Sequence, residues 1–492
     1  MTKLHGMGSL TRKPIESILE EAGKSDGTLK RVLGPWHLVA LGIGAIIGSG
    51  IFVLTGQAAA QYAGPSITLS FVLAAFASGL AGLCYAEFAA MLPISGSAYT
   101  YAYATLGELL AWIIGWDLIL EYLFGASAVA VGWSGYVTSF LKDFGLHLPA
   151  AFTGPPLQYT ADTGFQATGN IINLPAVLIV LLMTSFLVVG IQESAWLNNV
   201  AVVSKVAVIL AFIAFGYGYV NPENWTPFIP PEGDNFGEFG YGGILRGAGV
   251  IFFAYIGFDA VSTTAQEAKN PQKDMPVGIL GSLVVCTILY MLVSLVLTGL
   301  VHYTQLNVPD PIAVGVNAAG EGLHWLRFPI KLGAIAGLSS VILVLLMGQP
   351  RVFFAMAVDG LLPKVFSQLH PRFKTPHITT AVTGGVAAVL AGSLPIGLLG
   401  EMVSIGTLLA FVLVCAGILI LRYREPERER PFKCPLVPII PAGGILACFY
   451  LMYGLPWHTW ERLIAWMIIG FIIYFAYGKN HSKWSRQESS EN

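Results

Sequence analysis

Long apolar stretches are the feature that most constrains how this chain can fold. Segments of about 20 mostly apolar residues, the length of a helix that crosses a bilayer, follow one another along the 492 residues. In lipid every backbone polar group must be paired within the protein. These segments therefore predict an all-α integral membrane protein with twelve transmembrane helices. The candidate spans are 35–61, 66–91, 107–141, 173–191, 194–219, 241–268, 277–300, 328–357, 377–394, 399–421, 436–454 and 459–477.

The third span, 107–141, is unusually long. Since no turn residues divide it, we expect one strongly tilted helix rather than two crossings. The segment 96–106 is predicted to form an interfacial helix before it. Residues 15–19 form either an amphipathic turn at the membrane surface or part of a disordered tail.

Composition excludes several other classes of protein. Charged residues make up 11% of the chain, whereas average soluble domains carry roughly 25%. The 26 basic and 28 acidic residues nearly cancel, which gives no indication of a nucleic-acid partner. The five cysteines lie apart, without a CxxC or Cys/His cluster, so neither a disulfide framework nor a zinc site is indicated. No cofactor or metal is predicted. Without an HExxH, GxSxG or P-loop motif, an enzyme is not expected.

The distribution of Lys and Arg predicts the orientation of the chain. If the N-terminus lies inside and the spans alternate, 20 of the 26 basic residues fall on the inner side. We therefore predict a multi-pass protein of the cell (plasma) membrane with both termini in the cytosol. The basic residues on or near the outer face are Lys142, Arg246, Arg327, Lys331 and Arg462.

Two spans carry glycine patterns that predict interrupted helices. Span 1 contains Gly48-Ser49-Gly50, and glycine costs about 1 kcal/mol relative to alanine inside a helix. Span 6 contains Tyr255-Ile256-Gly257-Phe258-Asp259, where Asp259 is a candidate N-cap for a second half-helix. Glycines that only allow close helix packing are the alternative. Paired broken helices in corresponding positions indicate the binding site of a secondary transporter.

The chemistry of such breaks favours a zwitterionic ligand. A half-helix that ends inside the membrane presents carbonyls with partial negative charge, and one that begins there presents amides with partial positive charge. An α-amino acid carries an ammonium and a carboxylate at a matching separation. A carboxylate on exposed amides needs no arginine.

Several motifs resemble one family over residues 28–478. They are GIGAIIGSGIFVLTG (42–56), CYAEFA (84–89), SGSAYTY (95–101), FFAYIGFDAVSTTAQEAKNPQKDMP (252–276) and DGLLPKVF (359–366). The chain thereby resembles the amino acid–polyamine–organocation (APC) superfamily, and within it the short bacterial form of the cationic amino acid transporter family.

The resemblance implies a five-plus-five inverted repeat with helices 1 and 6 broken, followed by two C-terminal helices. It also implies alternating-access transport of amino acids. The expected division is an N-terminal cytosolic segment, a first repeat, a second repeat, helices 11 and 12 with the loop before them, and a cytosolic tail. Their ranges are 1–33, 34–220, 241–422, 423–478 and 479–492.

Carried onto this sequence, the resemblance places the substrate carboxylate on Ser49 and Gly50, as the dipole argument also does. The ring of Phe253 is a candidate outer gate or a packing residue. The carbonyls expected to hold the ammonium are those of Ile46, Phe253, Ala254 and Ile256.

Lys205 lies in the middle of span 5, where a charged lysine costs roughly 2.5–3.5 kcal/mol. In the resembling family a lysine here lies against helices 1 and 8, so Lys205 is the candidate for proton coupling. A structural or snorkelling lysine is the alternative. Glu121 and Asp259 are candidate supporting polar residues. The residues expected to face the substrate side chain are Ala126, Ser127 and Leu345.

We therefore predict a secondary active permease for small neutral or cationic L-amino acids, with proton-coupled symport as the mode. An amino acid exchanger and a non-transporting sensor with the same fold are the alternatives. The expected partners are an amino acid, protons and membrane lipid. The sequence does not reveal an accessory small membrane subunit.

Overall fold

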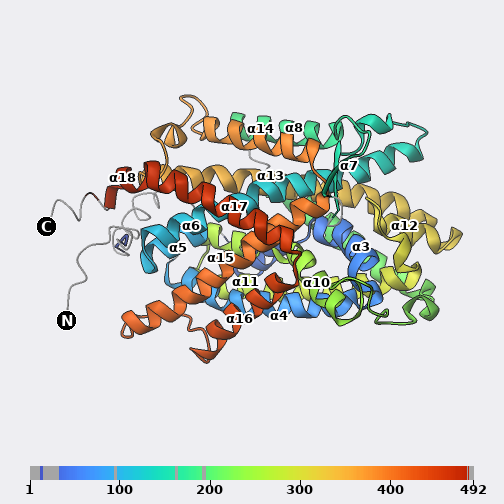
Figure 1. Cartoon of the computed structure of the whole chain (residues 1–492), viewed down its shortest axis with the longest axis horizontal. Coiled ribbons are helices and arrows are strands. Elements are labelled where there is room, and N and C mark those ends of the chain that lie inside the picture. Colours follow the sequence, from blue (N-terminus) through green and yellow to red (C-terminus); the bar gives the residue numbers. More distant parts are fainter. Residues whose placement is uncertain are drawn as a thin grey trace.

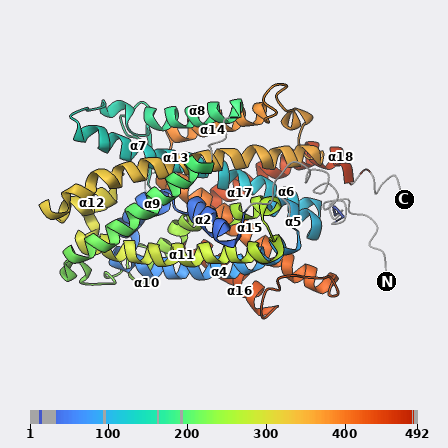
Figure 2. The ribbon, with the colours of Figure 1, turned by 180° about the vertical axis from the view of Figure 1, so that it is seen from behind.

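The helices run along one long axis (Figure 1). At one end of the molecule α5 (Ser97–Thr105) lies near α18 (Lys479–His481). Toward the other end lie α3 (Thr55–Ala58) and α12 (Pro311–Ala318) (Figure 1), and Figure 2 shows α12, α5 and α18 from the opposite side. These are called the α18 end and the α12 end below. The structure is a computed structural model that describes residues 12–14, 33–92, 97–160, 164–190, 195–484 and 486.

The expected turn at 15–19 and most of the segment 1–33 lie outside the described residues. The first half of the chain is helical apart from a hairpin of two four-residue strands, β1 (Leu157–Thr160) and β2 (Gly164–Ala167), which pair antiparallel. Its other helical elements are α2 (Pro35–Ile46), η2 (Gly50–Leu54), η3 (Ala59–Ala63), η4 (Gly64–Ser66), α4 (Ile67–Met91), α6 (Glu108–Ile119), η5 (Leu120–Phe124), α7 (Gly125–Asp143), η6 (Ala150–Phe152), α8 (Leu174–Val189), α9 (Ala195–Gly216), η7 (Tyr217–Tyr219) and η8 (Pro222–Trp225).

The second half is also helical. Its elements are α10 (Gly240–Ile251), η9 (Phe252–Tyr255), η10 (Asp259–Glu267), α11 (Pro271–Leu300), η11 (Tyr303–Gln305), η12 (Glu321–Leu323), α13 (His324–Val358), η13 (Lys364–Ser367), α14 (His377–Ser393), α15 (Ile396–Arg424), α16 (Ile439–Gly454), α17 (Trp457–Ile473) and η14 (Tyr474–Gly478). The elements η2, η3, η5 and η14 are π-helical, and the other η elements are 3₁₀-helical.

Among the described residues, eight helical runs are long and apolar enough to cross a membrane. This confirms the predicted class of all-α membrane protein at that level. Four shorter apolar helices, α2, α8, α14 and α16, fall within the predicted spans 35–61, 173–191, 377–394 and 436–454, and the long run Gly50–Met91 covers the rest of the first span together with the second. The long third span is one continuous helical run, Glu108–Asp143, with the π turn η5 at its middle.

The break in helix 1 lies slightly earlier than the glycines suggest. The helix α2 ends at Ile46, and Ile47 is extended with φ −72° and ψ 98°. Ser49 again has helical backbone angles, and it is the cap residue of the π turn that starts at Gly50. The unwound residues are therefore Ile47 and Gly48, rather than the predicted Gly48-Ser49-Gly50.

The break in helix 6 differs from the prediction in its second half. Ile256 is extended, and Gly257 has a φ of +117°, which favours glycine. The chain then continues as the 3₁₀ segment η10, not as an α-helix. Its cap position is Phe258, without a side-chain hydrogen bond, so the N-cap role predicted for Asp259 is wrong.

Both described ends of the chain meet at the α18 end. Lys13 is 6% exposed, and its Nζ forms an ion pair with Asp359, 2.9 Å from Oδ1. The Tyr99 hydroxyl donates to Asp359 Oδ2 at 2.9 Å, and the backbone amide of Lys483 donates to the carbonyl oxygen of Asp359 at 3.1 Å. Residues from α5, from the end of α13 and from both terminal segments thus form one contact.

Candidate functional site

The carbonyl end of α2 is capped by a buried lysine. Lys205 on α9 is fully buried, and its Nζ donates to the carbonyl oxygen of Gly44 and, at 2.9 Å, to that of Ile47. On α13, a Cβ added to Gly337 would lie 3.1 Å from the Cβ of Lys205. The lysine therefore lies between α2, α9 and α13, with its ammonium on the free carbonyls that end a half-helix.

A tyrosine joins the two breaks. The hydroxyl of Tyr290, on α11, lies 2.9 Å from the carbonyl oxygen of Ile46 and 2.9 Å from that of Ala254. Both carbonyls belong to the predicted ammonium site. A carbonyl oxygen has two lone pairs, so each can still accept another donor. Sequence reasoning missed Tyr290, although a tyrosine in mid-span needs a partner for its hydroxyl.

Two glycines let the breaks approach each other. A Cβ added to Gly50 would lie 2.3 Å from the Cβ of Ala254, closer than real side chains come. A Cβ added to Gly257 would lie 2.8 Å from the carbonyl carbon of Ala45. Helices 1 and 6 are thus in backbone contact at their interruptions.

A fully buried hydroxyl also lies at the break of helix 1. The Oγ of Ser49 has no hydrogen-bond partner among the described residues. It stands at the start of the outer half-helix, where backbone amides are free by geometry. This combination is suited to an anion such as a carboxylate.

The residues predicted to face the substrate side chain are only partly brought together. A Cβ added to Gly125 on α7 would lie 3.4 Å from Leu345 Cδ1 and 4.0 Å from Phe253 Cε2. Leu345 and Phe253 therefore converge on one point of α7, and the neighbouring Ala126 is fully buried. The hydroxyl of Ser127 instead donates to the carbonyls of Leu123, at 2.9 Å, and Ala387, at 3.1 Å.

The remaining carbonyls of helix 6 sit in a closed environment. Phe253 is 6% exposed, and its amide donates to Ser404 Oγ on α15 at 3.1 Å. Ile256, at the extended residue of the break, is 7% exposed. The predicted ammonium ligands therefore lie in the protein interior.

The two candidate supporting carboxylates are buried and accept hydrogen bonds from hydroxyl groups. Glu121, in the π turn η5, accepts from Thr407 Oγ1 at 3.3 Å, and Asp259 accepts from the Tyr122 hydroxyl at 3.4 Å. Each is 1% exposed. π turns are frequent at functional sites, and this one carries both Glu121 and Tyr122.

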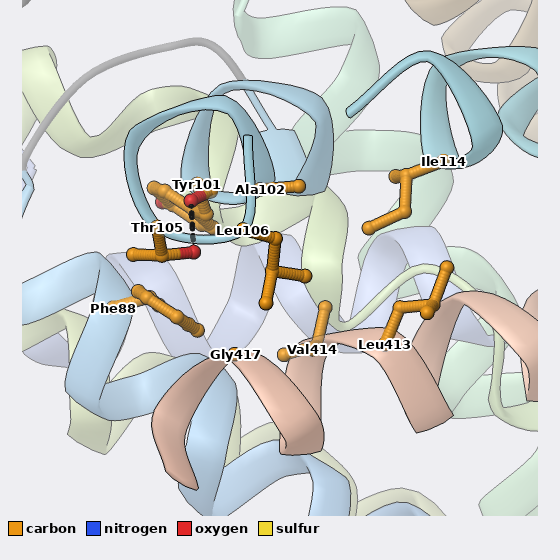
Figure 3. Close-up of a pocket in the computed structure, with 9 residues that line it drawn as sticks. All are labelled: Phe88, Tyr101, Ala102, Thr105, Leu106, Ile114, Leu413, Val414 and Gly417. Atoms are coloured by element: carbon orange, nitrogen blue, oxygen red, sulfur yellow. Dashed lines mark hydrogen bonds between the residues drawn. The ribbon is translucent and has the colours of Figure 1, made fainter. Parts of the chain in front are cut away.

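An apolar crevice at the α18 end is not part of this site. It is formed by α4, α5, α6 and α15 and includes no predicted site residue (Figure 3). The Thr105 hydroxyl within it donates to the Tyr101 carbonyl at 2.7 Å. The crevice therefore offers little to a polar ligand.

Comparison with known proteins identifies the family. The amino acid permease family matches residues 33–474 of the chain. The chain belongs to the amino acid permease family. This confirms the resemblance to the APC superfamily and a transporter rather than an enzyme.

Relatives of this permease are named for different substrates. The branched-chain amino acid permease BcaP of Bacillus subtilis is 48% identical over 97% of this chain and 99% of its own. The methylthioribose transporter of the same organism has the same identity and coverage. The vacuolar cationic amino acid transporter 4 of Arabidopsis thaliana is 40% identical over 86% of this chain and 68% of its own.

Proposed function

We propose that this permease is a secondary active transporter that carries amino acids by proton-coupled symport. The main support is the contact of Lys205 Nζ with the carbonyls of Gly44 and Ile47. A hydrogen bond from a charged donor is roughly twice as strong as a neutral one. Loss of the proton from Lys205 would weaken its hold on the end of α2. Protonation would thereby bias the position of the inner half of helix 1.

The substrate bridges the two breaks in this proposal. The carboxylate binds the amides at Ser49 and Gly50, and the ammonium binds the carbonyls of Ile46, Phe253, Ala254 and Ile256. The unpartnered hydroxyl of Ser49 supports the carboxylate position. The second lone pairs of the Ile46 and Ala254 carbonyls leave room for the ammonium beside Tyr290.

The proposed substrates are small neutral and branched-chain L-amino acids. Phe253 and Leu345 provide an apolar wall, and the related BcaP carries a branched-chain name. Because the Arabidopsis relative is named a cationic amino acid transporter, cationic amino acids are also among the compounds to test.

Methylthioribose is a second candidate substrate. Gln349 is fully buried, and neither its Oε1 nor its Nε2 has a partner among the described residues. It follows Leu345 by four residues on α13, hence on the same face. An amide at this position could bind sugar hydroxyls. The second Bacillus relative, which is named a methylthioribose transporter, is the reason to test this compound.

The topology we propose has twelve spans, an inverted five-plus-five repeat and both termini in the cytosol of the cell. Corresponding helices of the two repeats pack together: α4 with α11, α7 with α13, and α8 with α14. Such pairing is expected around a pseudo-two-fold axis in the membrane. The predicted cytosolic residues Lys13 and Lys483 meet at the α18 end, in agreement with that orientation.

The test is uptake by purified protein in liposomes, with labelled leucine, alanine, arginine and methylthioribose, with and without an inward proton gradient. Gradient-driven accumulation that is lost in Lys205→Ala, while exchange persists, supports symport. Equal accumulation by Lys205→Ala would make the lysine structural. Exchange without net uptake identifies an antiporter, and binding without flux a sensor.

A further inference from the structure

A serine hydroxyl from α15 enters the backbone of helix 6 just before its break. The helix α15 packs against both α10 and η9. The amide of Phe253 donates to Ser404 Oγ at 3.1 Å, and the same hydroxyl donates to the carbonyl oxygen of Val250 at 3.3 Å. Ser404 is fully buried. One side chain thus serves a backbone donor and a backbone acceptor of a neighbouring helix.

The Val250 carbonyl and the Phe253 amide have the spacing that a direct 3₁₀ hydrogen bond would join. They flank the point where α10 ends at Ile251 and η9 begins at Phe252. A side chain that inserts into the backbone ladder of a helix is a recognised cause of a kink. Ser404 therefore holds this turn of helix 6 wider than a closed 3₁₀ turn would be.

The Ser404 hydroxyl has no further proton to give to a substrate. A serine carries one O–H donor, and the Val250 carbonyl takes it. Ser404 differs in this from Ser49, whose hydroxyl has no partner among the described residues. We therefore expect Ser404 to act on a substrate through the backbone of helix 6, not by direct contact.

The carbonyls predicted to hold the substrate ammonium follow directly after this turn. The Phe253 carbonyl accepts from the Ile256 amide at 3.2 Å. The Ala254 carbonyl lies 2.9 Å from the hydroxyl of Tyr290 on α11. The break is thus held by α15 at one peptide group and by α11 at the next. Since each carbonyl oxygen has a second lone pair, fixing these peptide groups also fixes where the free lone pairs point.

The same face of α15 also contacts helix 6 beyond the break. Phe411 lies about two helical turns after Ser404, on the same face of α15. Its ring packs edge-on against Phe252, before the break, with centroids 5.6 Å apart and an interplanar angle of 74°. It also packs against Phe258, after the break, at 5.1 Å. Through these two residues α15 supports helix 6 on both sides of its interruption.

We propose that Ser404 is a positioning residue for substrate binding. Its hydroxyl, held between the Val250 carbonyl and the Phe253 amide, keeps helix 6 open so that the carbonyls at the break face the substrate ammonium. The inference rests on the proposed binding of an amino acid across the two breaks. Without the hydroxyl, the two backbone groups either pair directly, which tightens the turn, or lose their partner in the interior. Either change disturbs the ammonium site and leaves the carboxylate site on helix 1 in place.

The experiment compares L-leucine with 4-methylpentanoate, the same acid without its ammonium group. Competition against labelled leucine on purified protein in lipid gives both affinities. We expect Ser404→Ala to weaken leucine binding about tenfold, the effect of losing a buried hydrogen bond, and to leave the affinity for 4-methylpentanoate nearly unchanged. Ser404→Thr keeps a hydroxyl and should bind leucine nearly as the wild type does. The matched control is Ser282→Ala, because Ser282 is also fully buried but donates to Ile279 of its own helix α11.

A second measurement needs no substrate. Hydrogen exchange in residues 250–258 should be faster in Ser404→Ala than in the wild type and in Ser404→Thr, because the Phe253 amide loses its acceptor. Unchanged exchange in Ser404→Ala, or an equal loss of affinity for leucine and 4-methylpentanoate, would overturn the proposal.

The two measurements also separate this proposal from the proposed function. If the wild type binds no amino acid, the proposed function fails, and hydrogen exchange still decides whether the hydroxyl holds the break. If Ser404→Ala does not fold, Ser404→Cys takes its place in both measurements, since a thiol has nearly the same size and forms weaker hydrogen bonds.

Discussion

The hydroxyl of Tyr290 lies within 2.9 Å of the carbonyl oxygen of Ile46, at the end of α2. It lies at the same distance from the carbonyl oxygen of Ala254, at the break of helix 6. It has one proton and so can donate to one carbonyl at a time. Two interrupted helices are thus linked through a third, α11, by a bond that can pass from one to the other.

Replacing Tyr290 with phenylalanine should weaken substrate binding. The change removes the link but keeps the ring, and a typical hydrogen bond contributes about 0.5–1.5 kcal/mol. We expect Kd to rise roughly twofold to tenfold, measured by isothermal titration with the substrate found in the uptake assay. Tyr255→Phe is the matched control. Tyr255 lies at the break of helix 6, but its hydroxyl donates to the carbonyl oxygen of Phe71, which belongs to neither break. Equal affinity of Tyr290→Phe and the wild type would refute this role.

Gly50→Ala should be far more damaging than Gly48→Ala. The new Cβ at residue 50 would lie 2.3 Å from Ala254 Cβ, whereas at residue 48 it would lie 3.4 Å from Val341 Cγ1, an ordinary contact. Overpacking of this kind costs typically 1–3 kcal/mol. We expect Gly50→Ala to lower the melting temperature and abolish binding. Similar melting and binding for the two variants would show that the breaks can separate without loss.

This contact also explains what sequence reasoning could and could not reach. The runs of apolar residues were enough to predict an all-α membrane protein, and the Gly48-Ser49-Gly50 pattern predicted an interruption in helix 1 close to the observed one, since both depend on local composition. The contact between Gly50 and Ala254 depends on how two distant helices are aligned, which no local pattern encodes. Tyr290 escaped notice for the same reason.

The second half of helix 6 shows another limit. A side-chain cap on an α-helix was predicted at Asp259 from its residue type, yet the segment is 3₁₀-helical and capped at Phe258. The π turn η5, which carries Glu121, has no recognisable signature in the sequence. Tertiary contacts decide both features.

Asp310 should make stability depend on pH at the α12 end. It precedes α12, and burial raises the pKa of its carboxyl above the ordinary range, although Ser139 donates to it. A carboxyl whose pKa is raised by folding adds stability below its unfolded pKa of about 3.9 and loses it as pH rises through the folded value. Asp310→Asn should therefore melt higher than the wild type at neutral pH, with the difference shrinking toward acid.

Thermal melts of both proteins across acid to neutral pH measure this difference. Asp143→Asn is the control, and it should lower the melting temperature. Asp143 pairs with Arg327 and Lys331, so its replacement leaves two cations without that partner. A constant difference between Asp310→Asn and the wild type at every pH would contradict the prediction.

The ion pair between Lys13 and Asp359 should hold the α18 end closed. Both side chains are 7% exposed, and removal of one partner from a buried pair costs roughly 3–5 kcal/mol. We expect Lys13→Ala to raise hydrogen exchange in α5, which Tyr99 joins to Asp359, and in residues 481–484. Asp359→Ala should raise exchange in the same segments, and exchange in the double variant should not be much faster than in either single variant.

The control is Glu461→Gln, which breaks an exposed pair with His458 and should change exchange little. If Lys13→Ala leaves exchange in α5 at the wild-type rate, the terminal segment only rests on a bundle that closes without it. If exchange rises there and nowhere near α12, the segment is part of the closure itself, because the two ends of the bundle then respond separately.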